Sequence, residues 1–310
     1  MQHRVVIGLN AVVTALMGGE PHVLCVRRED GWGLPYGAFD PVRHRTFEIG
    51  MRDFVSRQTA LTLGYAEQLY TFGDEGREAP LASLSGGEAS DRIVSVGYLA
   101  LSPEAGSTGR REVAWRSWYD HFPWEDRRRG DEALGPILDA LMAWAAGEAS
   151  RQARIALAFG QAEEGWQEER ALDRYELMYE AGLVPEAERD GHAGGRRMAD
   201  DGAMTSDHRR ILATAIGRLR GKLRYRPVIF ELVPDPFTLS DLQEAVEGVL
   251  GFCVHKQNFR RAVEATGLVR KTGETAQGTG GRPAALYARA RVPVTAGLGL
   301  TLPRLRAECA

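Results

Sequence analysis

Six of the seven residues at 255–261, near the C-terminus, carry side chains that proteins use to bind nucleic acid. The apolar spacing predicts a helix from His255 to Ala265, in which Phe259 and Val263 face the core. Arginine and lysine bind guanine edges or phosphates, and asparagine and glutamine pair with adenine. We therefore expect the exposed face of this helix to contact DNA through His255, Lys256, Gln257, Asn258, Arg260 and Arg261.

The elements around this helix have the order of a winged helix-turn-helix domain. Residues 238–241 resemble a helix-capping box, and an apolar stripe follows to Leu250 before a turn at Gly251. After the second helix, predicted strands at Leu268–Lys271 and Ala285–Arg289 enclose a glycine-rich hairpin. In this arrangement the second helix enters the major groove and the hairpin lies along the DNA backbone. Further DNA contacts are expected in the approach segment and the hairpin, at Lys222, Arg224, Arg226, Lys271, Thr272 and Arg282.

The charge of the chain is unevenly distributed. From His208 onward there are 17 Lys and Arg residues and 8 Asp and Glu residues, a net charge of +9, whereas the first 207 residues carry −12. A basic end on an acidic body is typical of a nucleic-acid-binding module. Charge alone is equally consistent with a basic, solvated surface that binds nothing.

Composition favours a cytoplasmic protein with no membrane partner. The chain is 44% hydrophobic and 26% charged, as ordinary globular proteins are. No apolar run is long enough to span a bilayer, and the first residues do not form a signal peptide. The three cysteines, Cys25, Cys253 and Cys309, lack metal-binding spacing and fit a reducing compartment.

A second motif, near the N-terminus, resembles a Nudix box that has lost its acids. Gly31–Gly37 resembles the start of that box, and Gln58–Leu61 resembles its end, Glu-Glu-Thr-Gly-Leu. In Nudix hydrolases, glutamates on the intervening helix hold divalent metal against a diphosphate, because hard cations need several carboxylate oxygens.

Two alignments of the helix to that motif are open. Counting back from Leu61 puts Phe54, Arg57 and Gln58 at the metal positions. Counting forward from Gly37 puts Arg52, Val55 and Ser56 there. Neither alignment supplies one acid, so we expect no metal site, no catalytic residue, no required cofactor and no enzymatic activity.

The remaining pattern predicts an α+β fold. Strands are expected at Val5–Val13, Val23–Arg27 and Ile93–Leu101, a loop at Gly31–Pro41, and helices at Thr46–Leu61, Glu148–Gly182 and Ser206–Leu223. We divide the chain into a Nudix-like α/β/α sensor domain (1–146), a helical connector that also serves dimerisation (147–223) and a winged-helix DNA-binding domain (224–310).

Over nearly its full length the chain resembles the Nudix-related transcriptional regulators of NAD metabolism (NrtR), and more closely their larger NadQ-type relatives. The strings that carry this resemblance lie at 70–74 with Arg77, 92–98, 118–126, 174–177, 225–232, 255–261 and 280–284. The resemblance implies a homodimeric repressor on a palindromic operator near genes of NAD biosynthesis or salvage. It also implies that a nucleotide in the Nudix-like domain, NAD, ADP-ribose or ATP, sets DNA occupancy.

Candidate residues for binding this effector follow from their chemistry. Arg77 and Arg92 are phosphate partners, since a guanidinium group binds phosphate in a bidentate manner. Trp32, Tyr36 and Phe72 have rings that stack on a base, although ordinary core packing explains these aromatic residues equally well.

Two other functions compete with a ligand-gated repressor. The first is a Nudix-type hydrolase fused to a DNA-binding domain, with an unusual metal site at Glu48 and Asp53. The second is a non-enzymatic protein whose basic C-terminal part binds an acidic protein. Hydrolysis of ADP-ribose separates the first from a repressor, and a strong salt dependence of duplex binding separates the second.

Overall fold

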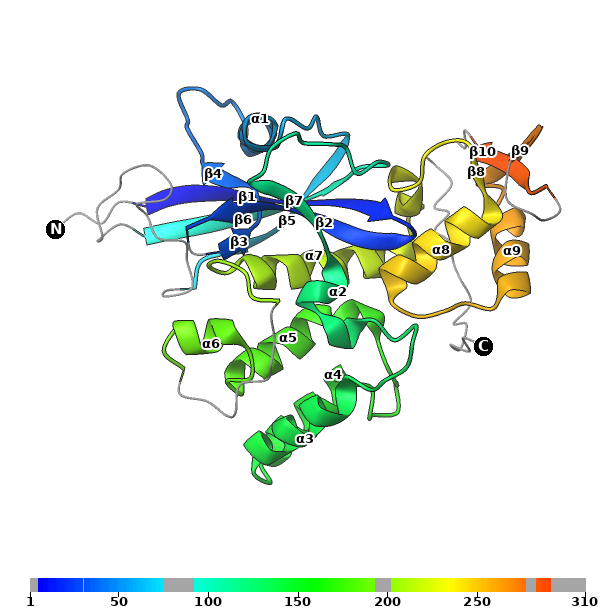
Figure 1. The fold of residues 1–310 in the computed structure, drawn as a ribbon. Helices are drawn as coiled ribbons and strands as arrows, with labels where there is room; N and C mark the ends of the chain where they lie inside the picture. Colours follow the sequence, from blue (N-terminus) through cyan, green and yellow to red (C-terminus); the bar gives the residue numbers. More distant parts are fainter. Residues whose placement is uncertain (1–4, 30, 75–91, 193–201, 277–282, 291–310) are drawn as a thin grey trace.

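A computed structural model describes residues 5–29, 31–74, 92–192, 202–276 and 283–290 (Figure 1). A mixed β-sheet with helices on both faces makes up the N-terminal part, and a smaller helical unit with its own sheet lies at one end of it. This is the predicted α+β architecture. Among the described residues, no helix is both long and apolar enough to cross a lipid bilayer.

The N-terminal sheet is built on its longest strand, β1. Its strand order is β3-β2-β1-β6-β5, with β4 also paired to β1 and β7 to β2. β1 and β6 are parallel, and the other pairs are antiparallel. The strands are β1 (Val5–Met17), β2 (Glu20–Arg28), β3 (Gly31–Gly33), β4 (Tyr36–Ala38), β5 (Tyr65–Phe72), β6 (Arg92–Leu101) and β7 (Val113–Ser117).

Alternate side chains of β1 enter two separate cores. Leu9 and Val13 belong to the core closed by helix α1 (Phe47–Thr59). Val12 belongs to the core on the opposite face, which helix α7 (His208–Leu223) helps to close. Because successive side chains on a strand point to opposite faces, a strand buried on both sides needs a continuous apolar run. The run at the start of this chain meets that need.

Helix α1 has nearly its predicted bounds. The hydroxyl of Thr46 caps it by accepting a hydrogen bond from the Ile49 amide at 3.2 Å, and it ends at Ala60 in the left-handed conformation. The loop prediction at Gly31–Pro41 is wrong in part, because this segment contains β3 and β4. Its glycines and prolines shorten the strands to three residues each without preventing their pairing to β2 and β1.

The predicted helical stretch at Glu148–Gly182 is two helices, not one. Gly160, with a φ of +71°, brings the chain against the backbone of Trp166 and so separates α4 from α5. The helices between β7 and α7 are α2 (Trp118–His121), η2 (Pro123–Glu125), α3 (Leu134–Ala145), α4 (Ala149–Ala158), η3 (Glu168–Arg170), α5 (Ala171–Glu180) and α6 (Pro185–Arg189).

The segment proposed as a connector packs on the sheet. Helix α7 contacts β1, β5 and β6, and α5 packs against α7 in turn. Figure 1 shows α7 beneath the sheet, with α5 and the α3–α4 pair farther below. The segment therefore supplies the second helical layer of the N-terminal sandwich, and the boundary at residue 146 remains a prediction.

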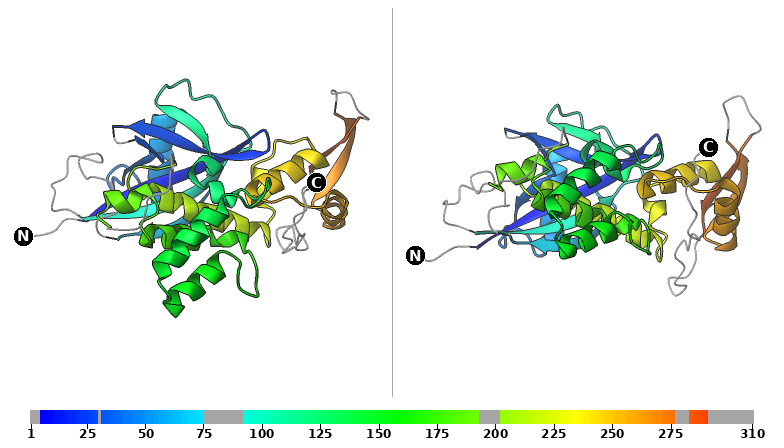
Figure 2. Two further views of the ribbon diagram at one scale, coloured as in Figure 1. Left: turned by 60° about the horizontal axis from the view of Figure 1, so that its bottom comes forward. Right: turned by 90° about the horizontal axis from the view of Figure 1, so that it is seen from below.

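The C-terminal unit has the predicted order of elements. Helix α8 (Leu239–Leu250) starts in a complete capping box, in which the Thr238 hydroxyl and the Asp241 carboxylate each accept the other residue's amide hydrogen bond. It is followed by α9 (Lys256–Ala265), and a sheet of order β8-β10-β9 completes the unit (Figure 2). These strands are β8 (Phe237–Thr238), β9 (Val269–Thr275) and β10 (Ala285–Arg289).

A buried carboxylate joins the helical layer to the C-terminal unit. Glu125 pairs with Arg174 of α5, with Nε to Oε1 at 2.5 Å, and with Arg220 of α7, and all three side chains are fully buried. Arg220 also donates from Nε to the Val249 carbonyl of α8 at 2.8 Å. Burial by itself raises the pKa of Glu125, but the two guanidinium groups outweigh it and hold that pKa below its ordinary value.

Two glycines allow the close approach at this junction. A Cβ atom on Gly248 of α8 would overlap the carbonyl oxygen of Gly19, in the β1–β2 turn. Gly251 ends α8 with a φ of +78°, and a Cβ atom there would overlap the Glu125 carbonyl oxygen. Larger residues at either position would force the two units apart.

We predict that Glu125→Gln destabilises the protein by about 3–5 kcal/mol, because the change leaves two buried guanidinium groups without their counter-charge. Since folding lowers the pKa of Glu125, its contribution is present at neutral pH and is lost as the pH falls through the folded-state pKa. Urea titrations at neutral and acidic pH measure both effects.

Glu169→Gln is the matched control. Glu169 pairs with Arg224 at 2.9 Å, but both side chains are partly exposed. The control variant is expected to lower the free energy of unfolding by about 0–1 kcal/mol. Equal losses in the two variants would contradict a special role for the buried network.

Candidate functional site

The exposed face of α9 carries the side chains expected to contact DNA. His255, Lys256, Gln257 and Arg261 are exposed, while Phe259 is buried in the core. Two further polar residues of α9 form side-chain hydrogen bonds within the C-terminal unit. Asn258 accepts a hydrogen bond from Arg261 at 2.8 Å, and Arg260 donates to Ser240 at 3.3 Å. The helix thus exposes His255, Lys256, Gln257 and Arg261, whereas Arg260 contacts Ser240 of α8.

The structure contradicts two of the predicted contacts in the approach segment. Lys222 is buried and pairs with Glu67, and its ammonium also donates to the Tyr65 hydroxyl at 2.9 Å. Arg224 is exposed but forms ion pairs with Glu168 at 2.6 Å and Glu169 at 2.9 Å. These cations bind carboxylates of the N-terminal part, which neutralises the charge that sequence reasoning assigned to DNA.

The other predicted contacts have mixed positions. Arg226 and Lys271 are exposed, on the segment after α7 and on β9. The Thr272 hydroxyl donates to the Leu286 carbonyl at 3.1 Å, within the hairpin, so its primary role is to hold β9 to β10. Arg282 lies outside the described residues.

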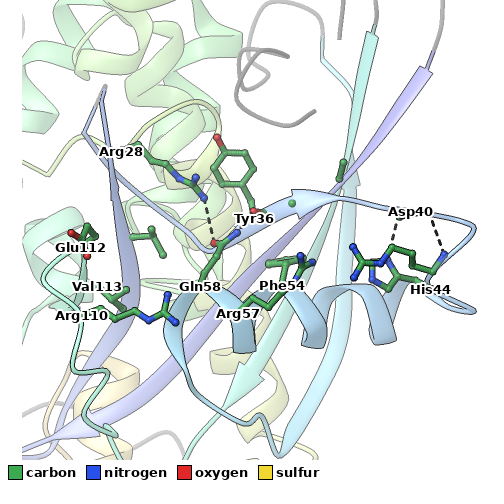
Figure 3. A pocket seen from close by; sticks show the side chains of 14 residues that line it. Arg28, Tyr36, Asp40, His44, Phe54, Arg57, Gln58, Arg110, Glu112 and Val113 are labelled. Atoms are coloured by element: carbon green, nitrogen blue, oxygen red, sulfur yellow. Dashed lines mark hydrogen bonds between the residues drawn. The ribbon is translucent and has the colours of Figure 1, made fainter. Parts of the chain in front are cut away.

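A pocket of about 570 Å³ lies over the face of the sheet that α1 covers (Figure 3). Its walls come from β2, β4, α1, the loop before α1 and the segment leading into β7. This volume lies within the range of small-molecule sites. The charged and titratable groups of the lining are Arg28, Arg43, His44, Arg57 and Arg110, with the two carboxylates Asp40 and Glu112.

The pocket decides between the two Nudix alignments. Phe54, Arg57 and Gln58 line it, as alignment from Leu61 requires. The alternative alignment places Arg52 at a metal position. In the structure Arg52 instead pairs with Glu48 at 2.9 Å and caps the Leu63 carbonyl at 2.6 Å, and it does not line the pocket. Arg57 and Gln58, which the alignment from Leu61 assigns to metal positions, therefore face the pocket.

The divalent metal of Nudix hydrolases does not fit these residues. Asp53 forms a hydrogen bond with His44 at 3.1 Å and an ion pair with Arg57 at 2.7 Å, so neighbouring side chains already occupy its carboxylate. The hydrogen bond from His44, together with Arg57, lowers the pKa of Asp53. Within the part of the chain that the structure describes, no three His, Cys, Asp or Glu residues are grouped to hold a metal ion.

One wall of the pocket is a linked set of three side chains (Figure 3). The Arg28 guanidinium lies 4.3 Å from the centre of the Tyr36 ring and donates to the Gln58 side-chain oxygen at 3.3 Å. The Gln58 amide donates in turn to the Tyr36 carbonyl at 2.7 Å. These contacts fix the orientation of Arg28 at the pocket wall.

Of the four predicted effector residues that the structure describes, only Tyr36 lines the pocket. Phe72 is buried and Trp32 is half-buried, and both pack with the core on the α7 face of the sheet. Neither lines this pocket, and their assignment as base-stacking residues stays a prediction. Arg92 is exposed at the start of β6 and donates to the Gly73 carbonyl at 2.7 Å, away from the pocket lining. Arg77 lies outside the described residues.

Sequence reasoning did not predict that Arg28, Arg43 and Arg110 line the pocket, and it named Arg57 only as a residue at a former metal position. Arg28 follows Val26 at a spacing of two on a strand, which places both side chains on the same face. Arg57 and Gln58 follow Phe54 at spacings of three and four on a helix, which does the same. These spacings were visible in the sequence. They do not indicate that this face of β2 and this face of α1 line the same pocket.

Helix α7 connects this wall to the C-terminal unit. His208, in its first turn, packs edge-on against the Tyr36 ring at 5.1 Å, and its Nδ1 accepts from the Leu34 amide at 3.0 Å. Burial lowers the pKa of His208 to about 3, so the ring is neutral at physiological pH. Near the other end of the helix, Arg220 bonds to α8.

Comparison with known proteins agrees with both units. Residues 229–288 match the family described as the NrtR DNA-binding winged helix domain. The C-terminal unit is therefore similar to an NrtR-type winged helix. The chain is also 40% identical over 81 residues to the ADPR-responsive transcriptional repressor NtrR of Acinetobacter baylyi, a match that spans 26% of this chain and 32% of that repressor. The predicted family resemblance is thereby confirmed.

Solved structures extend the likeness to the overall fold. The chain superposes on Shewanella oneidensis NrtR in complex with a 27mer DNA with a TM-score of 0.57 and 21% identity, covering 92% of this chain and 93% of that one. It superposes on a MutT/nudix family protein from Enterococcus faecalis with a TM-score of 0.55 and 16% identity, covering 94% and 88%. The NrtR-type winged helix therefore follows an N-terminal part with a Nudix-like fold.

The NrtR-type winged helix leads to a prediction that separates two kinds of lysine. Lys256→Ala removes an exposed cation on α9 and is expected to weaken binding to all duplexes and to reduce the salt slope of binding by about one. Gln257→Ala is expected to reduce the binding free energy for the operator by about 1–3 kcal/mol and to leave binding to random duplex unchanged. Anisotropy titrations on operator and random duplex at two salt concentrations measure these effects.

Lys222→Ala is the control of matched residue type. Because Lys222 is buried against Glu67, this variant is expected to keep the wild-type salt slope and to lose stability instead. If Lys222→Ala reduced the salt slope and Lys256→Ala did not, the assignment of the DNA-binding face to α9 would be wrong.

Proposed function

We propose that this protein is a transcriptional repressor of NAD biosynthesis or salvage genes whose DNA occupancy is set by ADP-ribose or a related nucleotide. The observation that carries the proposal is an NrtR-type winged helix on a Nudix-like part whose pocket has arginine and glutamine where metal-binding glutamates are expected. Such a site is suited to bind a nucleotide without cleaving it.

The choice of ADP-ribose as first effector follows from the pocket and the relatives. Four arginines line the cavity, and guanidinium groups are well suited to diphosphates. The Acinetobacter relative is named as ADPR-responsive. NAD and ATP share the adenine nucleotide and its phosphates, so they are the comparison ligands.

Coupling between pocket and DNA is supported by the path of α7. The helix has 16 residues and is therefore about 24 Å long. It begins against Tyr36 at the pocket wall and approaches α8 through Arg220. A ligand that moves Tyr36 would change the position of a rigid element that bears on the winged helix.

Hydrolysis is the competing function, and specific contacts weigh against it. Glu48 pairs with Arg52, does not line the pocket, and is half-exposed. Asp53 is occupied by His44 and Arg57. We infer that neither carboxylate is free to hold a metal beside a diphosphate, and that the protein is not an enzyme.

In a thermal-shift screen, ADP-ribose is expected to raise the melting temperature by linkage and to change the affinity for operator duplex. In the presence of Mg²⁺ or Mn²⁺ it is expected to be recovered intact, because no carboxylate pair activates water. Chromatography of the nucleotide and anisotropy of labelled operator are the measurements. Turnover above that of a Glu48→Gln, Asp53→Asn double variant would instead establish the hydrolase.

We further propose that the protein acts as a homodimer on a palindromic operator. A single DNA-binding module buries only about 600–1,000 Å² of surface on DNA, and two half-sites about one helical turn apart give the usual affinity. Light scattering is expected to give twice the chain mass of 34.1 kDa. A monomer at micromolar concentration that still bound operator tightly would refute this proposal.

A further inference from the structure

The pocket places a cation where a Nudix hydrolase places metal ligands. Arg57 lies on the pocket face of α1, one turn after Phe54, and Gln58 lies beside it. The charged lining consists of four arginines and two carboxylates, a net charge of +2 with His44 neutral. A divalent cation would be repelled by this surface, whereas a diphosphate would be attracted to it.

The two arginines closest to the Nudix positions are held in place before any ligand arrives. Arg28 is stacked on Tyr36 and bonded to Gln58, and its Nε is buried with no hydrogen-bond partner among the described residues. Arg57 is held by Asp53 at 2.7 Å. Asp53 is in turn held by His44 at 3.1 Å. The orientation of the Arg57 guanidinium is therefore fixed by Asp53 and His44.

The carboxylates of the lining have other partners or lie apart from this pair. One oxygen of Asp40 accepts hydrogen bonds from the backbone amides of Val42 at 2.9 Å and Arg43 at 3.3 Å, which shapes the loop before α1. Glu112 is exposed on the segment leading into β7. Neither comes from α1, where the metal ligands of a Nudix box lie.

From this arrangement we propose that Arg57 and Arg28 replace the divalent cation, so that the pocket binds the diphosphate of a nucleotide without any metal. A guanidinium group matches two phosphate oxygens with parallel N–H bonds, and it carries its charge at all physiological pH values. It has no open coordination position on which to lower the pKa of a water molecule, as a bound metal does. Binding and hydrolysis are thereby separated.

This inference rests on the proposed function for the identity of the nucleotide, but its chemistry is tested independently. Calorimetric titration of the full chain with ADP-ribose, and with pyrophosphate as the bare diphosphate, is made with EDTA and again with excess Mg²⁺. No gain of affinity from EDTA to Mg²⁺ is expected for either probe, and pyrophosphate is expected to bind more weakly in Mg²⁺ because the cation complexes its phosphate oxygens. Binding that required Mg²⁺ would overturn the inference.

Arg57→Glu restores the acid found at this position in Nudix hydrolases. The Arg57 side chain is 56% exposed, so the variant is expected to fold, as circular dichroism will check. In EDTA its affinity for either probe is expected to fall about 10- to 100-fold, because a charge-assisted hydrogen bond is lost. Arg57→Lys keeps the charge but not the planar guanidinium group, so its affinity is expected to lie between those of the wild type and Arg57→Glu.

Arg45→Glu is the matched control. Arg45 is exposed, lies on the loop before α1 and does not line the pocket, so the same change of charge is expected to leave affinity unchanged. Equal losses in Arg45→Glu and Arg57→Glu would reduce the effect to net charge and overturn the inference.

Failure of the proposed function gives a different pattern. If pyrophosphate and ADP-ribose bound in EDTA but left operator affinity unchanged, metal-free recognition would stand and nucleotide gating would fall. If ADP-ribose changed operator affinity only with Mg²⁺, gating would stand and the replacement of metal by arginine would fall.

Discussion

The packing of the two units depends on one buried carboxylate. Glu125 accepts hydrogen bonds from Arg174 and Arg220, and through these arginines it binds together α5, α7 and, by the Val249 carbonyl, α8. Removing three charged groups from water is costly, and the cost is met only where each group finds its partners in good geometry. The positions of the helices around the network are therefore restricted, and the β1–β2 turn must approach α8 at Gly248, where a larger residue would not fit.

This restriction gives the pocket a defined relation to the DNA-binding face. β2 carries Arg28 at one end, in the pocket wall, and contacts α8 near the other. α7 begins under Tyr36 and approaches the same helix through Arg220. β2 is a strand of the sheet and α7 packs on it, so two regular elements extend from the pocket wall to α8. A two-state rearrangement at the junction would be needed to convert that displacement into a change of DNA affinity.

The N-terminal part illustrates how a fold is kept while its chemistry changes. The sheet, α1 and the capped start of α1 at Thr46 are maintained by apolar packing and backbone hydrogen bonds, none of which needs the Nudix acids. Arg57 and Gln58 are free of that constraint because they contribute polar groups and not core volume, whereas Phe54 both lines the pocket and packs in the core. Arginine and glutamine are tolerated there, and a hydrolase scaffold is left with a surface suited to anion binding.

The sequence by itself determined the elements and the type of the C-terminal unit. The capping box at Thr238, the apolar stripe of α8 and the polar face of α9 depend on residues a few positions apart, and such local patterns predict an element and its buried face. The absence of acids from both alignments of the Nudix motif was also visible in the sequence, and its consequence for catalysis stays a prediction. Only the tertiary structure decided which alignment of α1 is correct, that Lys222 faces Glu67, that Phe72 packs away from the pocket and that Glu125 pairs with Arg220, 95 positions along the chain. Periodicity shows that a face is buried or exposed, but the partner that covers it comes from a distant segment, and hydrogen bonds between such segments leave no repeat in the sequence.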